Sequence, residues 1–182
     1  MNAEQLIITI SGLHGVGKSV YSKEVAKRFG LRRLSAGQIF REIARERKIT
    51  LEELSKIALE TIDIDKEIDE YIVNEARKGG VVVDALLSGW LLKNEAQIRI
   101  YLTAPLEERV KRIAERDGKS FKEAFKETTL REDSERKRFK KYYGIDIDDL
   151  SVYNFIIDTS LSDFQTIKEM IFKLVEGYLK TH

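Results

Sequence analysis

The stretch LIITISGLHGVGKSVYSKEVAKRFG, from Leu6 to Gly30, decides the fold of this chain. It opens with a short apolar, β-branched run that is typical of a buried strand, and it ends in a helical pattern closed by glycine. Between the two, residues 12–19 match the pattern Gly-x-x-x-x-Gly-Lys-Ser/Thr at every fixed position. This context of strand, glycine-rich turn and helix is what a phosphate-binding loop requires. A chance lysine in a glycine-rich turn would not explain both flanks.

The chemistry of this loop is electrostatic. Its glycines let the backbone curl so that N–H groups converge on a phosphate chain, and the helix N-terminus adds partial positive charge at the same point. Lys18 can reach the β- and γ-phosphates, and the hydroxyl of Ser19 can ligate Mg²⁺. We therefore expect a nucleoside triphosphate to be bound by Gly12, Leu13, His14, Gly15, Val16, Gly17, Lys18 and Ser19.

The composition excludes several classes of protein. A length of 182 residues suits one domain with a real core, and a formal net charge of +1 gives no general attraction to nucleic acid or membrane. The absence of cysteine excludes disulfides and thiolate metal sites. No stretch approaches the length of a membrane span, and no cationic leader precedes Leu6. We therefore expect no signal peptide and a cytoplasmic enzyme.

Apolar runs alternate with helical patterns along the whole chain. The apolar runs predict five strands, at 6–10, 32–35, 81–84, 98–102 and 154–158. Such alternation predicts an α/β fold with a five-stranded parallel sheet that helices cover on both faces. No linker or repeat interrupts the pattern, so we expect a single domain over residues 1–182.

Several helix boundaries can be predicted from local signals. Thr50, three residues before Glu53, predicts a capping box, and Asp63 is expected to cap the next helix. Two charged helical stretches follow the only proline, at about 106–117 and 120–143. The last amphipathic pattern predicts a helix that presents to the core Phe164, Ile167, Ile171, Leu174 and Tyr178.

Two further groups are expected at the sheet edge that carries the loop. The segment from Ser35 to Arg41 follows the second strand, and Asp84 ends the third. The carboxyl ends of parallel strands meet at one edge, where ligands gather in open α/β sheets. Asp84 is expected to order Mg²⁺ through water. The alternative is a carboxylate that only caps the end of its strand.

Two helical segments carry cations on one face, as phosphoryl transfer requires. One set recurs at i, i+3 and i+7, namely Arg109, Arg112 and Arg116. The other recurs at i, i+4 and i+7, namely Arg131, Glu135 and Arg138. The alternative is a solvated helix held by i,i+4 ion pairs such as Glu127–Arg131 and Glu132–Arg136.

The ordered motifs resemble a known family. The pattern Ser35-x-Gly37-x-x-x-Arg41 after the second strand is similar to the nucleoside monophosphate kinases. Four further segments resemble the archaeal cytidylate kinases, at 63–69, 88–90, 129–153 and 155–160. The resemblance implies the P-loop NTPase fold, ATP as phosphoryl donor with Mg²⁺, and CMP or dCMP as acceptor.

The resemblance also implies where the acceptor binds. Ser35, Gly37 and Arg41 match the family's segment for the acceptor phosphate, which Arg41 would grip. They lie in an expected monophosphate-binding region of about 35–80. One position departs from the family pattern, because Leu86 stands where an arginine commonly helps to hold the monophosphate.

The remaining roles concern the donor and a mobile lid of about 118–143. Arg131 and Arg138 match arginines that reach the substrate from the lid, and Glu135 stands where the family often has aspartate. Arg112 and Arg116 match the preceding helix, which contacts ATP. The expected catalytic residues are Lys18, Arg131 and Arg138. Neither His14 nor His182 is assigned a catalytic role.

Other functions stay open at this point. Adenylate kinase is disfavoured because its Asp-Gly-Phe-Pro-Arg segment after the third strand is missing. Acceptors such as AMP or UMP, and a P-loop ATPase that acts as a binding module or switch, remain as alternatives. The chain has no Asn-Lys-x-Asp guanine motif, and in an ATPase the lid arginines would lack a purpose. We expect a monomer whose partners are small nucleotides.

Overall fold

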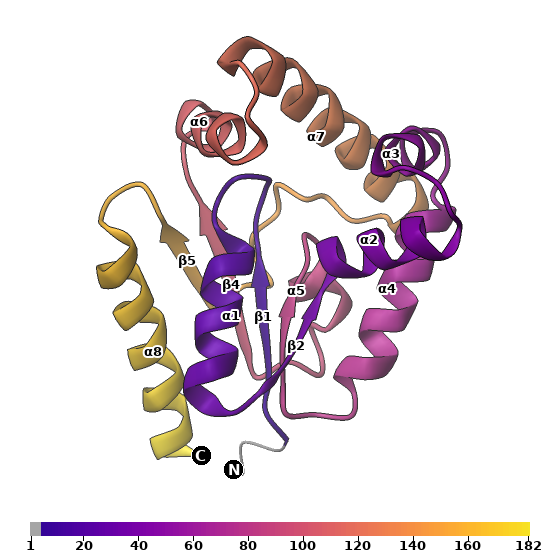
Figure 1. The fold of residues 1–182 in the computed structure, drawn as a ribbon. Coiled ribbons are helices and arrows are strands. Elements are labelled where there is room, and N and C mark those ends of the chain that lie inside the picture. The colour runs from indigo at the N-terminus through magenta and orange to yellow at the C-terminus, as the bar shows by residue number, and fades with distance from the viewer. Residues whose placement is uncertain (1–4) are drawn as a thin grey trace.

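The computed structural model describes residues 5–182. Residues 1–4 lie outside the described part. The expectation of no signal peptide is based in part on these residues. The five predicted strands are confirmed to within one residue at each end, as β1 Ile7–Ser11, β2 Arg32–Ser35, β3 Val81–Asp84, β4 Ile98–Thr103 and β5 Phe155–Asp158. They form one parallel sheet in the order β2-β3-β1-β4-β5 (Figure 1).

Helices connect the strands and surround the sheet. Their bounds are α1 Lys18–Phe29, α2 Ala36–Glu46, α3 Leu51–Glu60, α4 Asp63–Ala76, α5 Ser88–Leu91, α6 Leu106–Asp117, α7 Phe121–Tyr143 and α8 Phe164–Thr181. None of the helices within residues 5–182 is long and apolar enough to cross a membrane.

The sheet has a separate apolar core on each face, because side chains alternate along a strand. On one face, Ile8 and Ile10 of β1 pack with Val25 of α1 and Ile171 of α8. On the other face, Ile7 packs with residues of α2, α3 and α4. The prediction of helices on both faces is confirmed.

The register of the strands assembles the polar edge of the sheet. Asp84 of β3 pairs with Ile10 of β1 on one side and with Ser35 of β2 on the other. The chain builds the sheet outward from β1 on both sides, with β3 and β2 on one side and β4 and β5 on the other. Ligands bind at such a switch point in open α/β sheets. The loop after β1 and the ends of β2 and β3 therefore meet at one crevice.

Helix α7 lies across the carboxyl edge of the sheet. Figure 1 shows it above the strands, with α6 at one end and α3 at the other, and both helices contact it. The helix begins with a capping box between Ser120 and Glu123 and ends at Gly144 in the left-handed conformation. It occupies most of the segment that is expected to form the lid.

Three local predictions have different outcomes. The capping box of Thr50 and Glu53 is confirmed. The prediction that Asp63 caps α4 is wrong, because Ile62 is the N-cap and Asp63 is already the first helical residue. The prediction that Phe164 faces the core is also wrong. It lies at the start of α8, is 42% exposed, and packs its ring against that of Tyr21, with the ring centroids 5.2 Å apart.

Gly89 in α5 generates a test of the packing. A Cβ on Gly89 would lie 2.1 Å from a ring carbon of Tyr153, whereas a Cβ on Gly177 in α8 would meet nothing within 4 Å. Gly89→Ala should therefore lower the free energy of unfolding by about 1–3 kcal/mol through overpacking. Gly177→Ala should raise it by about 0.5–1 kcal/mol, because alanine favours a helix. Urea unfolding of both variants checks this, and equal effects would contradict the packing described.

Candidate active site

The loop after β1 passes through a space that only glycine fits. A Cβ on Gly12, at φ 138°, would lie 2.2 Å from the carbonyl oxygen of Leu102 at the end of β4. A Cβ on Gly15, at φ 83°, would lie 2.5 Å from the carbonyl oxygen of Arg109 in α6. The loop is therefore pressed against β4 and α6 while its backbone takes a left-handed path that glycine alone adopts freely.

Lys18 is the first residue of α1, and its side chain folds back over the loop. Its Nζ donates to the carbonyl oxygens of Gly12, at 2.6 Å, and of Leu13, at 2.9 Å. Burial lowers the pKa of Lys18, although nearby Asp84 and Glu135 favour the charged form. The ammonium group thus stands inside the loop, where an anion can replace its carbonyl partners.

Asp84 forms a buried polar centre at the end of β3. Its Oδ2 accepts hydrogen bonds from Arg33 Nη2 at 2.6 Å, Ser35 Oγ at 3.1 Å and Ser22 Oγ at 3.3 Å. The Ser22 hydroxyl also lies 3.2 Å from the carbonyl oxygen of Ser19, so the carboxylate adjoins the start of α1. No motif in the sequence indicated Arg33. Its role depends on the pairing of β2 with β3.

The expected acceptor segment runs from Ser35 at the end of β2 into the second turn of α2, where Arg41 lies. Arg41 is exposed and makes no ion pair within residues 5–182. A Cβ on Gly37 would lie 3.7 Å from Arg41 Nη1 and 4.0 Å from Ser35 Oγ. The guanidinium therefore folds along this turn toward the sheet edge. It is free to take an anion.

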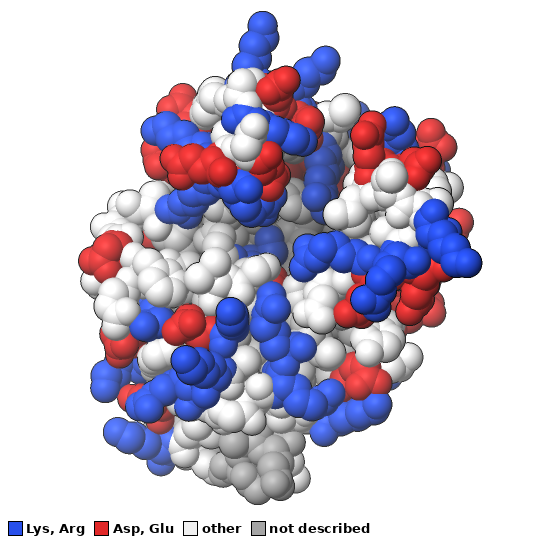
Figure 2. All heavy atoms as spheres, in the orientation of Figure 1, with Lys and Arg blue, Asp and Glu red and all other residues white. Residues whose placement is uncertain are grey.

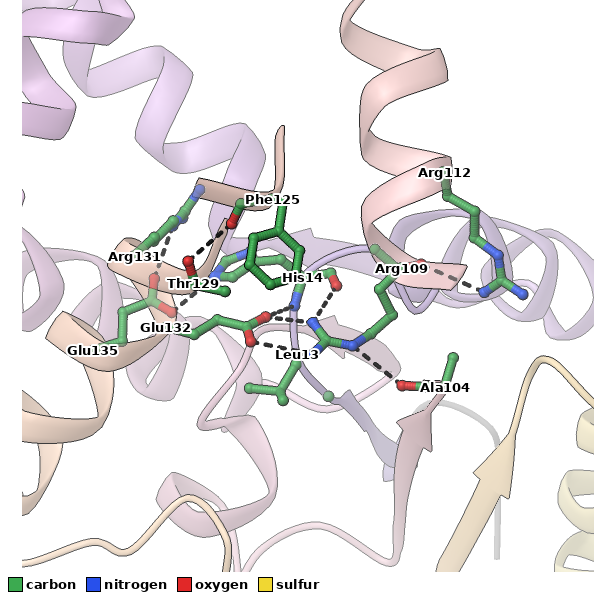
Figure 3. Close-up of polar contacts among 12 residues, drawn as sticks. Leu13, His14, Ala104, Arg109, Arg112, Phe125, Thr129, Arg131, Glu132 and Glu135 are labelled. Carbon is green, nitrogen blue, oxygen red and sulfur yellow. Dashed lines mark hydrogen bonds and ion pairs between the residues drawn. The ribbon is translucent and has the colours of Figure 1, made fainter. Parts of the chain in front are cut away.

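Arg109 is a buried residue at the centre of the site that was not assigned from the sequence. Its guanidinium forms a two-pronged ion pair with Glu132 of α7 and donates to the carbonyl oxygens of His14, at 2.9 Å, and Ala104, at 3.2 Å (Figure 3). Glu132 in turn accepts from the backbone N–H of His14 at 3.2 Å. One ion pair thus joins β4, α6, α7 and the loop. The i+7 spacing pointed only to a shared helix face.

The structure separates the two arginines expected to contact ATP. Arg112 donates to the carbonyl oxygen of Gly15 at 3.4 Å and to the hydroxyl and carbonyl of Thr159 at 2.9 Å each, so it borders the loop. Arg116 pairs with its neighbour Asp117 on the exposed surface. No contact joins it to the loop in this conformation.

The three residues expected on α7 do face the carboxyl edge. Glu135 is buried and accepts from Arg131 Nε at 2.9 Å, while its other oxygen lies 2.8 Å from His14 Nε2 (Figure 3). Arg138 donates through Nε to Asp65 of α4 at 3.0 Å and through Nη1 to Ser134 at 2.6 Å. The arrangement joins α7 to both the loop and α4.

The solvated-helix alternative for α7 is wrong in its particulars. Glu127 pairs with Lys119 rather than with Arg131, and Glu132 pairs with Arg109 rather than with Arg136. Basic side chains surround the mouth of the site instead. Figure 2 shows a hollow between the upper helices and the sheet, with lysine and arginine at its rim and in its depth.

An apolar cluster forms the wall below α7. Leu86 and Leu87, which follow β3, pack with Ile62 before α4, with Phe139 of α7 and with Leu13 of the loop. The position that commonly carries arginine in the resembling family is therefore part of an apolar surface beside the loop.

Two carboxyl groups of α4 border this wall. Burial raises the pKa of Asp65 to about 6, and the charge of Arg138 only partly opposes the shift. Burial raises the pKa of Asp69 to about 7, although the hydroxyl of Tyr143 donates to its Oδ2 at 3.0 Å. Asp69 thus ionises near neutral pH.

This shift predicts how stability depends on pH. Between the ordinary aspartate pKa of 3.8 and about 7, the folded state holds a proton on Asp69 that the unfolded state has lost. The free energy of unfolding therefore falls as pH rises through this window. Asp69→Asn keeps the acceptor for Tyr143 but cannot ionise, so it should make the decline between pH 4 and 7 shallower, as measured by urea unfolding, and leave the part that comes from Asp65. The control is Asp63→Asn, an exposed position of the same helix. A decline as steep as in the unmodified chain would contradict the burial of Asp69.

Fold and loop together define a P-loop protein built like the small kinases. Among solved structures, the shikimate kinase from Acinetobacter baumannii superposes with a TM-score of 0.63 at 20% identity, covering 96% of each chain. The deoxyadenosine kinase from M. mycoides superposes with a TM-score of 0.51 at 19% identity, covering 94% of this chain and 100% of that one. At these identities the likeness concerns the fold.

Sequence comparison identifies the family. Residues 7–161 match the model of the cytidylate kinase-like family. The cytidylate kinase of Staphylothermus marinus is 49% identical over 96% of this chain and 99% of its own length. That of Ignicoccus hospitalis is 43% identical over 93% and 98%. The chain therefore belongs to the cytidylate kinase-like family, and the resemblance seen in its motifs is confirmed. Membership implies a phosphotransferase with ATP as donor.

Proposed function

We propose that the protein transfers the γ-phosphoryl group of ATP to CMP or dCMP, giving ADP and CDP or dCDP. One observation carries the proposal: Lys18, Arg41 and Arg131 come from three separate helices at the carboxyl edge of the sheet, and the charge of Arg131 is near enough to Lys18 to lower its pKa. Phosphoryl transfer needs such positioning and charge neutralisation more than it needs covalent chemistry. The family and its curated relatives, named cytidylate kinases, support the acceptor.

The donor would lie in the loop. Backbone N–H groups of residues 12–19 and the N-terminus of α1 would hold the phosphates, with Lys18 exchanging its carbonyl partners for phosphate oxygens. Arg112, which borders the loop beside Gly15, would hold the outer part of ATP. Arg116 would have to leave Asp117 to join it.

The residues present also fit Mg²⁺. The described residues offer no cluster of three acidic or histidine ligands, so the protein alone builds no metal cage. Mg²⁺ suits such a site, because it keeps several waters and is bound chiefly by phosphates with one or two protein oxygens. The exposed hydroxyl of Ser19 would ligate it, and Asp84, which directs only Oδ2 at protein donors, would order its waters. The ion would neutralise phosphate charge.

The acceptor phosphate would lie between the turn of α2 and α7. Arg41, with Ser35 and Gly37 beneath it, would grip this phosphate, and Arg131 and Arg138 would approach it from above. A phosphate oxygen of the acceptor forms the new bond to the γ-phosphorus as the bond from that phosphorus to the bridging oxygen of ADP breaks. The attacking oxygen is already ionised at neutral pH, so no general base is required.

The segments around the phosphates would act as two moving regions of a single domain. The monophosphate-binding region spans about 35–80, and a lid of about 118–143, containing α7, would close to exclude water, which would otherwise accept the phosphoryl group. The enzyme would act as a cytoplasmic monomer on small nucleotides.

The wall around Leu86 would give the acceptor phosphate no cationic partner. Because this position is apolar, Arg41, Arg131 and Arg138 would carry the charge of the monophosphate without a fourth arginine. AMP or UMP as acceptor, and an ATPase acting as a switch, are the alternatives that an acceptor panel separates.

The decisive experiment measures ADP release from ATP with each of CMP, dCMP, UMP and AMP. We expect release that depends on CMP or dCMP. Lys18→Ala should lower kcat by on the order of 100-fold or more, because the lysine stabilises charge on the transferring group. Lys23→Ala removes an exposed lysine of the same helix and should keep full activity. Hydrolysis that needs no acceptor would favour the ATPase, and wild-type turnover in Lys18→Ala would contradict the donor site.

A further inference from the structure

His14 occupies a variable position of the loop pattern, yet side chains of two other elements bind its backbone. Its N–H donates to Glu132 at 3.2 Å, and its carbonyl accepts from Arg109 at 2.9 Å. Both partners are buried, at 6% and 5% exposure. The imidazole therefore projects from a fixed point toward α7 (Figure 3).

The imidazole contacts the carboxylate that also holds the lid arginine Arg131. Glu135 binds His14 through Oε2, at 2.8 Å, and Arg131 through Oε1, at 2.9 Å. Burial opposes ionisation of Glu135, but its interactions with His14 and Arg131 outweigh burial and lower its pKa. Burial lowers the pKa of His14, and the attraction of Glu135 only partly offsets this. An ionised carboxylate can only accept a hydrogen bond, so Nε2 of His14 carries a hydrogen and donates to Glu135.

Arg131 is held by one edge of its guanidinium only. Its Nε is bound to Glu135, and its terminal nitrogens form no hydrogen bond or ion pair within residues 5–182. The side chain is 57% exposed, and its charge is close enough to Lys18 to lower the pKa of that lysine. The free edge of the fork can bind a phosphate in a two-pronged manner.

We propose that His14 is a positioning residue of the transfer site: by holding Glu135 it aims Arg131 at the phosphate bound in the loop. The inference rests on the proposed function and adds a residue that works through Glu135 rather than on the substrate. An N–H donor suits this place, because it binds one carboxylate oxygen of Glu135 and leaves the other oxygen to hold Arg131. Besides Glu135, the charged groups that act on the ring are Arg131 and Lys18, and Lys18 is bound to the loop backbone.

The test is a double-mutant cycle on kcat with ATP and the preferred acceptor. His14→Ala should lower kcat on the order of tenfold, as expected for loss of a hydrogen bond to a charged group, with little change in the KM for ATP. His14→Gln keeps an N–H donor at nearly the same reach and should recover most of the loss. In an Arg131→Ala background, His14→Ala should lower kcat no further, because its effect passes through Arg131.

Arg136→Gln is the matched control, since it removes an exposed ion pair of α7 with Asp148 and should leave kcat unchanged. If the wild type is active and His14→Ala has the same kcat, this inference is overturned but the proposed function is not. Losses that multiply in the Arg131→Ala background, or a His14→Gln variant as slow as His14→Ala, would overturn it in the same way. A wild type that phosphorylates no acceptor would overturn the proposed function and this inference with it.

Discussion

The buried ion pair between Arg109 and Glu132 is the interaction on which the site depends. Taking both charges out of water is costly, and it is tolerated only where each group is fully hydrogen-bonded. Arg109 meets this condition with carbonyl oxygens of Ala104 and His14, and Glu132 meets it with the N–H of His14. The pair therefore fixes α6 and α7 to the phosphate-binding loop. Any closure of the proposed lid has to turn about this point rather than separate the helix from the loop.

A second buried carboxylate organises the opposite side of the crevice. Asp84 accepts three hydrogen bonds on one oxygen, from side chains of β2 and α1, so the end of β3 is joined to both of these elements. The two carboxylates stabilise different parts of the carboxyl edge. Glu132 joins α7 to the loop, and Asp84 joins the end of β3 to α1. The groups free to bind anions are Arg41, which makes no ion pair within residues 5–182, and the terminal nitrogens of Arg131.

What could be predicted from the sequence was local. The strands, the loop and the capping box at Thr50 follow from short patterns whose physical cause lies within a few residues. Asp63 shows the limit of such patterns, because the choice of N-cap depended on how Ile62 packs into the apolar cluster. The four residues of α5 are too few to show a helical period, and no helix was predicted there.

The contacts within the site escaped prediction because they join distant segments. In the sequence, nothing distinguishes Arg109 and Arg33 from other helix and strand arginines. Their partners lie in α7 and β3, which only the fold brings beside them. The partner of Glu132 is 23 residues away, so i,i+4 spacing suggested the wrong arginine. The family resemblance supplied the lid residues Arg131 and Arg138, but no pattern in the sequence linked either to His14. The placement of the site residues as binding groups remains a prediction.

The most direct measurement is a crystal structure with a bisubstrate analogue that joins adenosine to cytidine through a chain of phosphates. We predict phosphate oxygens within hydrogen-bonding distance of Lys18 Nζ and of the terminal nitrogens of Arg131, with the Arg109–Glu132 pair intact. We also predict the cytidine end beside Arg41. An analogue bound away from residues 12–19, or an Arg131 turned to solvent while the phosphates fill the loop, would contradict the central claim that α7 and the loop together hold the transferring group.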